Sequence, residues 1–311
     1  MKKEERTAVI NKLLPEILEN AAATRKANQI VPVSGTRYTL PLEGRDIDIV
    51  YYPAASVKAP LIVGLHGGGF LFGGCALDDD LWVQVTGCLD VNVASVDYRM
   101  SPEVKDYDAL YDSYDSLLYL KAHADEFGFD PQHISVMGSS AGGNLAAAVC
   151  LLANREGTIQ LDNQILMYPF LDGATDPDLK GEGSFSGILP HIMNYLHFSE
   201  DKAKDPLLSP VFAGADLMKG LPNAVVSYCE EDNLRPEAIV YCSNLRAAGV
   251  PVSEFFAELM PHGYIESGFK TEFTEMDLQM LGDHAKELVE GGLLRKRSEE
   301  TLAFVKDHFV C

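Results

Sequence analysis

The part of the sequence best equipped for chemistry is the short run Gly138-Ser139-Ser140-Ala141-Gly142. It matches the pattern G-x-S-x-G, in which Ser140 is the candidate nucleophile and Gly138 and Gly142 leave room for a sharp turn. A β-forming run (ISVM) precedes it and a helix-forming run (GNLAAAVCLLA) follows it. Such a turn presents its serine beside a helix N-terminus, whose amides favour developing negative charge. A helix-capping turn without chemistry is the structural alternative for the same residues.

A serine hydroxyl is a weak nucleophile without a base, so a histidine and an acid are needed further along the chain. His262 is the candidate base, because its loop (MPHGYIES) follows the apolar run 252–256. Asp232 is the candidate acid, because it lies between a predicted strand and a predicted helix and would fix the tautomer of the imidazole. Glu230 and Glu231 are rivals, and all three are also typical of a helix start. The remaining histidines after Ser140 are expected to be solvated or structural: His191, His197, His284 and His308.

A second glycine-rich loop, His66-Gly67-Gly68-Gly69-Phe70, follows the apolar run LIVGL. Consecutive glycines let a backbone approach a substrate oxygen with its amides exposed, and the amide of Ala141 would complete such an oxyanion hole. A flexible loop or a phosphate cradle is the alternative. However, the Lys-Ser/Thr of a P-loop does not follow, and the spacing of a dinucleotide-binding loop is poorly matched.

The elements that would position these residues alternate along the chain. Short apolar runs predict strands, and longer amphipathic stretches between them predict helices, an order typical of an α/β fold with a mainly parallel sheet. The expected strands are 46–52, 61–65, 91–96, 134–137, 164–168, 224–228 and 252–256, and the expected helices are 108–127, 143–154 and 236–248. Each candidate site residue then follows the carboxyl end of a strand.

Two regions interrupt this alternation. Residues 1–35 contain a predicted amphipathic helix, with apolar residues at helical spacing (Val9, Ile10, Leu13, Leu14, Ile17 and Leu18). Residues 172–216 are rich in loops, prolines and glycines, and a long interruption of this kind is usually functional, often a lid. We expect a single domain over residues 1–311, with these two segments as cap elements.

Composition narrows the class of protein. Hydrophobic residues make up 47% of the chain, enough for a large core. A formal net charge of −21 disfavours nucleic acid and anionic membranes as partners. The longest apolar run, 145–153, is too short to span a bilayer. The six cysteines show no zinc-ligand spacing and no export signal precedes them, so we expect free thiols and a cytoplasmic protein without metal or other cofactor.

The motifs together resemble the hormone-sensitive-lipase-like branch of the α/β-hydrolases, over roughly residues 46–266. That family pairs HGGG with GDSAGG, and this chain has HGGG at 66–69 and GSSAGG at 138–143. Its YRLAPE, D-x-L-R and HGF segments correspond to YRMSPE at 98–103, DNLR at 232–235 and HGY at 262–264. One departure is Ser139, which stands where the family has Asp and removes a charge near the site. The stretch 270–290 matches no family feature. An extension of the cap and a part of a dimer interface are the two alternatives for it.

The resemblance implies an α/β-hydrolase fold and a role for each motif residue. Ser140 would be the nucleophile, His262 the base and Asp232 the acid; Gly68, Gly69 and Ala141 would donate to the oxyanion, and His66 would hold its loop in shape. The expected activity is hydrolysis of small or short-acyl esters, and Phe70, Phe72, Phe170, Phe185 and Phe198 are candidates to line the pocket. An amidase or formamidase with the same triad, and a binding protein that lost the chemistry, are the alternatives; a homodimer is possible.

Overall fold

Eight strands form one sheet at the centre of the computed structural model, which describes residues 3–273, 278, 281–282 and 285–311. The strand order is β1-β2-β4-β3-β5-β6-β7-β8; β2 runs antiparallel to both of its neighbours and the other pairs are parallel. The strands are β1 (Thr36–Leu42), β2 (Arg45–Tyr52), β3 (Leu61–Leu65), β4 (Asn92–Val96), β5 (Ile134–Ser139), β6 (Asn163–Met167), β7 (Asn223–Cys229) and β8 (Val252–Ala257). The predicted α/β fold with a mainly parallel sheet is confirmed.

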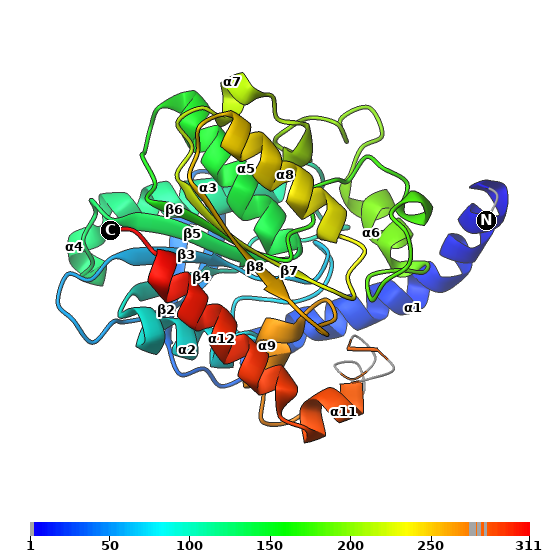
Figure 1. The fold of residues 1–311 in the computed structure, drawn as a ribbon, viewed down its shortest axis with the longest axis horizontal. Helices are drawn as coiled ribbons and strands as arrows, with labels where there is room; N and C mark the ends of the chain where they lie inside the picture. The colour runs from blue at the N-terminus through cyan, green and yellow to red at the C-terminus, as the bar shows by residue number, and fades with distance from the viewer. Residues whose placement is uncertain (1–2, 274–277, 279–280, 283–284) are drawn as a thin grey trace.

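Helices cover both faces of the sheet, and each face has its own hydrophobic core (Figure 1). The central strands are buried on both sides, which explains why they read in sequence as continuous apolar runs. One face is covered by α3 (Asp108–Ala122), α5 (Ala141–Glu156) and α8 (Arg235–Ala247). The other is covered by α2 (Asp79–Leu89), α9 (Tyr264–Phe269) and α12 (Leu293–His308).

A third cluster of apolar side chains joins the two segments predicted to form a cap. The helix α1 (Lys3–Ile30) extends along one end of the molecule and contacts α6 (Leu189–His197) (Figure 1). Ile10 and Ala21 of α1 pack there with Leu71, Ile192 and Leu196. The predicted N-terminal helix therefore buries its apolar stripe against α6 and against Leu71 and Phe72, which follow the glycine-rich loop, although Val9 of the predicted stripe is exposed.

Several sequence predictions of individual elements need correction. The expected helix 108–127 is two helices, because the backbone of His123 leaves helical geometry between α3 and α4 (Ala124–Phe127). Residues 172–216 hold more regular structure than their prolines and glycines indicate, namely α6, the start of α7 (Ala215–Met218) and the 3₁₀ turns Pro177–Leu179 and Pro210–Phe212. In the stretch 270–290, Leu281 and Leu288 join the core beside α9 and α12, and α11 spans Ala285–Glu290. His284 lies outside the described residues.

Two further features bear on the expectations from composition. None of the described helices combines the length and the apolar character needed to cross a bilayer. The six cysteines, which all fall within the described part of the chain, are free thiols.

Candidate active site

The nucleophile candidate Ser140 lies at the junction between β5 and α5, with an unusual backbone conformation (φ 53°, ψ −115°). A left-handed φ is costly for a residue with a side chain and persists only where the surroundings impose it. Glycine is required on both sides: a Cβ on Gly138 would collide with the carbonyl of Gly142, and a Cβ on Gly142 would collide with that of Leu65. The turn is therefore pressed against the end of β3, as the pattern G-x-S-x-G predicts.

The structure brings His262 and Asp232 to Ser140 from loops far apart in the chain. The hydroxyl of Ser140 lies 2.8 Å from Nε2 of His262, and Nδ1 of His262 lies 2.6 Å from Oδ2 of Asp232. Asp232 follows β7 and His262 follows β8, so parallel pairing of these strands with β5 and β6 delivers all three to one edge of the sheet. In the tautomer that donates from Nδ1 to the carboxylate, Nε2 accepts the serine proton.

The three side chains are almost completely buried, between 4% and 6% exposed. Burial by itself lowers the pKa of the His262 imidazole, but the charge and hydrogen bond of Asp232, with the charges of Glu266 and Glu237, outweigh it, and the pKa is raised overall. The second carboxylate oxygen of Asp232 accepts the amide of Leu234 (2.9 Å), and the hydroxyl of Ser184 accepts the amide of His262 (2.8 Å). The rivals Glu230 and Glu231 do not make the contact to His262: Glu230 accepts the amide of Leu259 and is exposed.

The loop at residues 66–70 lies beside the serine turn, because Leu65 of β3 pairs with Gly138 of β5. Gly68 and Gly69 both have positive φ (114° and 62°), which explains the glycine requirement there. Among the described residues, the amides of Gly68 and Gly69 donate to no backbone carbonyl, and Ala141 is the first residue of α5, where amides lack intrahelical partners. The three predicted oxyanion donors are thus backbone amides at the same edge of the sheet as Ser140.

His66 stands behind this loop as a fully buried, neutral side chain. Its ring stacks on Tyr98 (centroids 4.2 Å apart, 7° between planes), and Nδ1 donates to the carbonyl of Gly67 at 2.7 Å. The hydroxyl of Tyr98 donates to the carbonyl of His66 at 2.7 Å. Burial lowers the pKa of His66 to about 4, so it carries no charge near neutrality. Gly67 itself faces the hydroxyl of Ser139, which a Cβ there would approach to 3.2 Å.

A small apolar cavity opens at Ser140 and encloses about 210 Å³, its mouth included. Its lining comprises Gly69, Phe70, Ser140, Phe170, Phe185, Met193 and Asn194. Three of the five phenylalanines expected from sequence line it, whereas Phe72 packs toward α1 and Phe198 packs edge-on against Phe70 outside the lining. Met193 of α6 lies directly over Gly69, so that a Cβ on that glycine would collide with its sulfur.

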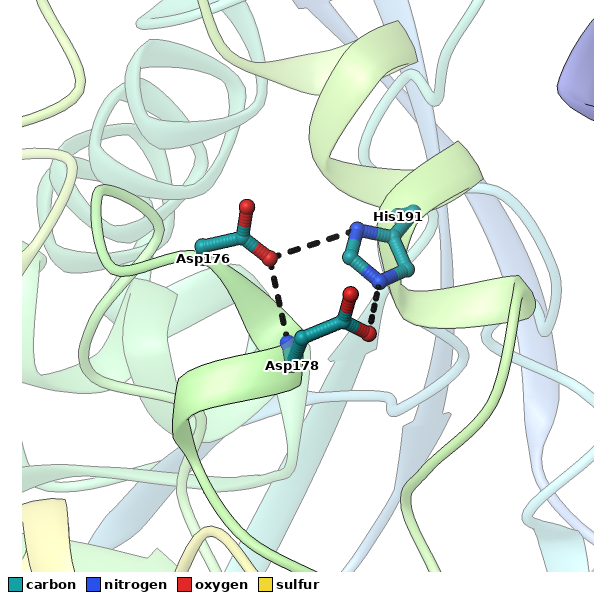
Figure 2. Close-up of side chains that lie close together, drawn as sticks. All are labelled: Asp176, Asp178 and His191. Atoms are coloured by element: carbon teal, nitrogen blue, oxygen red, sulfur yellow. Dashed lines mark hydrogen bonds and ion pairs between the residues drawn. The ribbon is translucent and has the colours of Figure 1, made fainter. Parts of the chain in front are cut away.

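The two histidines of the insertion, His191 and His197, lie on α6 and form hydrogen bonds with groups other than Ser140. His197 stacks on Phe70 (3.8 Å), and burial lowers the pKa of its ring to about 3. His191 donates to Asp178 at 2.9 Å and lies 3.8 Å from Asp176, as Figure 2 shows. The potential metal-ligand atoms of Asp176, Asp178 and His191 lie within 4.8 Å of one another. The guanidinium of Arg6 already pairs with both carboxylates, at 2.8 Å from Asp176 and 3.4 Å from Asp178.

Two contacts of the site escaped the sequence analysis. Ser184 lies in the irregular insertion, and no motif marks it as a partner of the His262 amide. Tyr168 packs against the imidazole edge (4.9 Å between ring centroids, 62° between planes) and ends the predicted strand 164–168. Its position at the carboxyl end of a central strand is the one signal that could have pointed to it.

A family model described as "alpha/beta hydrolase fold" matches residues 62–266, about two thirds of the chain. The chain belongs to the α/β-hydrolase family. Within that family it falls in the hormone-sensitive-lipase-like branch indicated by the HGGG and GSSAGG motifs.

Curated relatives of this α/β-hydrolase include several esterases. An arylesterase of Saccharolobus solfataricus is 33% identical over 245 residues, which cover 76% of this chain and 79% of that protein. The carboxylesterase NlhH of Mycobacterium tuberculosis is 33% identical over 232 residues, covering 71% and 72% of the two chains. Rabbit (Oryctolagus cuniculus) arylacetamide deacetylase is 29% identical, covering 67% of this chain and 69% of that protein.

Solved structures show the same fold over almost the whole chain. EstE1, a thermophilic and thermostable carboxylesterase cloned from a metagenomic library, superposes with a TM-score of 0.76 at 28% identity and covers 97% of this chain and 98% of its own. The esterase from the archaeon Pyrobaculum calidifontis gives a TM-score of 0.72 at 26% identity, covering 94% and 92%.

Proposed function

We propose that this α/β-hydrolase is a serine carboxylic-ester hydrolase that cleaves small or short-acyl esters through an acyl-enzyme. Esterase relatives at 33% identity support the class of reaction, which is that of a carboxylesterase. The observation that carries the assignment of residues is the unbroken chain of contacts from the Ser140 hydroxyl through His262 to Asp232. These three residues are the catalytic triad of the proposal.

In the first half of the reaction, Oγ of Ser140 attacks the ester carbonyl while Nε2 of His262 takes its proton. Asp232 stabilises the imidazolium that forms, without itself becoming protonated. The amides of Gly68, Gly69 and Ala141 donate to the oxyanion of the tetrahedral intermediate. The imidazolium then gives its proton to the leaving alcohol, and the acyl group stays on the serine.

In the second half, water replaces the alcohol. His262 takes a proton from water as it attacks the acyl carbon, and the same amides hold the second oxyanion. Collapse returns the proton to Ser140 and releases the carboxylic acid. This chemistry requires neither a metal nor an organic cofactor.

The preference for small acyl groups is supported by the size of the cavity at Ser140. The free space there is only about 210 Å³ even when the open solvent at its mouth is counted. Phe170, Phe185 and Met193 close it with apolar surface, which suits an acyl chain of a few carbons. We propose that residues 1–35 and 172–216 form the cap over this pocket.

An amide substrate is the second candidate, because one relative is named an arylacetamide deacetylase. Esters and amides differ at the leaving group, and the triad serves both. Paired assays with an aryl ester and the matching aryl amide would separate the two. A higher kcat/KM for the amide would replace the ester hydrolase by an amidase.

The central test compares wild type with Ser140→Ala on p-nitrophenyl acetate and butyrate. Removing the nucleophile of a serine hydrolase costs roughly 10⁴-fold or more in kcat, so the variant is expected to be nearly inactive. Ser139→Ala is the matched control, because it removes the neighbouring hydroxyl and leaves the turn intact. Equal turnover by wild type and Ser140→Ala would end the proposal.

A further inference from the structure

A second carboxylate, Glu266, lies on the helix that follows the candidate base. It is four residues beyond His262, in the first turns of α9. The hydroxyl of Tyr168 donates to Oε2 of Glu266. Tyr168 is 1% exposed, and its ring packs against the His262 imidazole. Glu266 therefore holds a side chain that forms one wall around the base.

The backbone on both sides of Tyr168 supports the nucleophile. The amide of Ser140 donates to the carbonyl of Met167 at 2.9 Å, and the amide of Phe170 donates to the carbonyl of Ser140 at 3.0 Å. The amide of Tyr168 is fixed by the carbonyl of Ser227 at 2.7 Å. The bond between Tyr168 and Glu266 consequently ties the helix that follows the base to the segment that holds the serine.

Charge adds to this mechanical link. Three carboxylates act on the His262 imidazole from different elements: Asp232 before α8, Glu266 on α9 and Glu237 on α8. After burial and the two contributions of Asp232, the charge of Glu266 is the next largest influence, and it raises the pKa of His262. Burial, with Glu266 adding, holds the pKa of Tyr168 well above its ordinary value, so the hydroxyl keeps the proton that it donates.

Within the described part of the chain, Asp78 also senses the charge of Glu266. Asp78 precedes α2, just beyond the glycine-rich loop, and burial together with the charge of Glu266 raises its pKa to about 7, while Lys270 opposes the rise. The other groups that sense the charge of Glu266 are Tyr264 and Cys229. Asp78 thus gains a negative charge near neutrality, and a pH experiment on the imidazole must be controlled for it.

We propose that Glu266 is a positioning residue for the base: it holds Tyr168 against the His262 imidazole and supplies a second negative charge that favours the imidazolium. This rests on the proposed function, since it concerns the proton acceptor of the same serine. Glu266 acts through Tyr168 and through its field, and it touches neither the serine nor the substrate.

The test uses a fluorophosphonate probe on the full chain, which reports the reactivity of Ser140 without requiring an ester substrate. Oγ attacks phosphorus, the O–P bond forms as the P–F bond breaks, fluoride leaves, and Nε2 of His262 takes the serine proton. The rate constant of labelling is measured from pH 5 to 9 for wild type, Glu266→Gln and Tyr168→Phe. Each of these three proteins is also prepared with the additional substitution Asp78→Asn, because an asparagine side chain cannot ionise. Glu258→Gln, an exposed glutamate, is the control.

Glu266→Gln keeps an acceptor for Tyr168 but loses the charge. Its labelling profile is expected to shift to lower pH by about half a unit to one unit, because imidazolium is less favoured. Tyr168→Phe is expected to lose about tenfold in rate at the plateau with a smaller shift, since a misplaced base reacts slowly. The double variant Tyr168→Phe/Glu266→Gln should show the pH shift of Glu266→Gln together with the lower plateau of Tyr168→Phe, because one change removes the charge and the other removes the hydrogen bond.

Unchanged profiles for Glu266→Gln, in both the wild-type and the Asp78→Asn backgrounds, would overturn the role of Glu266 while leaving the nucleophile assignment intact. A shift as large in Glu258→Gln would also overturn it, because the effect would then be general surface charge. Failure of wild type to be labelled at all would remove the proposed function, and this inference with it. Urea unfolding midpoints and far-UV circular dichroism distinguish loss of reactivity from loss of fold.

Discussion

Removal of Lys180 should destabilise the protein in a manner that depends on pH. Lys180 and Glu237 form an ion pair at 3.0 Å with side chains only 7% and 8% exposed. The ammonium also lies 4.3 Å from the centre of the Phe170 ring, in the wall of the cavity at Ser140. Glu237 accepts the amide of Leu171 as well, at 3.0 Å. The pair therefore fixes the insertion to α8 next to the candidate site.

The size of the effect follows from the titration of Glu237. Burial raises the pKa of this carboxyl to about 7, with Lys180 opposing the rise. The pKa of Glu237 is higher in the folded protein than in the unfolded chain. The free energy of unfolding therefore decreases as pH rises from the unfolded pKa toward 7. Above pH 7 Glu237 is ionised in both states of the wild type, so its contribution no longer changes with pH. In Lys180→Met the buried carboxyl stays protonated. The extra destabilisation relative to wild type should grow by about 1.4 kcal/mol for each pH unit above 7.

The assay is urea unfolding at pH 6, 7, 8 and 9, followed by fluorescence of Trp82. This is the single tryptophan of the chain, and it is 1% exposed beneath β3. At pH 6 the variant loses mainly packing and the hydrogen bond from the ammonium to the carbonyl of Asp172. Lys204→Met, which removes an exposed lysine of the same insertion, should show no such trend. A destabilisation by Lys180→Met that is the same at pH 6 and pH 9 would refute the reasoning.

Three further outcomes are expected. Gly142→Ala should destabilise the fold by about 3 kcal/mol or more in urea unfolding, because the added methyl group would collide with the Leu65 carbonyl. Gly87→Ala is the control: a methyl group at Gly87 meets no neighbouring atom, so this variant should be neutral or slightly stabilising. Met193→Ala should raise the ratio of p-nitrophenyl octanoate to acetate hydrolysis about tenfold, and an unaltered chain-length profile would count against the proposed acyl pocket. The kcat/KM of wild type should fall as pH drops through a pKa above 6.5, because protonated His262 cannot accept a proton. Asp232→Asn should shift this fall to lower pH and reduce kcat by about 10⁴-fold.

The sheet and the main site residues could be predicted from the sequence for one physical reason. Parallel strands buried on both faces leave uninterrupted apolar runs, and the polar residue after each run must lie at the same edge of the sheet. Ser140 and Asp232 follow such runs, whereas His262 follows the partly exposed edge strand β8, and the structure brings all three into contact.

Elements that depend on distant partners left weaker signals. The edge strand β1 is mostly exposed and contains Pro41, so its sequence carries little strand pattern. The nine-residue helix α6 is too short to be stable alone and is held by α1, which ends about 160 residues earlier in the chain. The bond between Tyr168 and Glu266 joins two ordinary-looking segments 98 residues apart, and no spacing rule predicts such a pair.

The placement of α1 has a consequence for biosynthesis. A ribosome makes this helix long before its partners Asp176 and Ile192 emerge. With only a few of its own residues buried, α1 has little reason to persist as an isolated helix in the meantime. Completion of the N-terminal end is therefore a late event in maturation, and a growing polypeptide acquires its finished pocket only after most of the hydrolase scaffold exists.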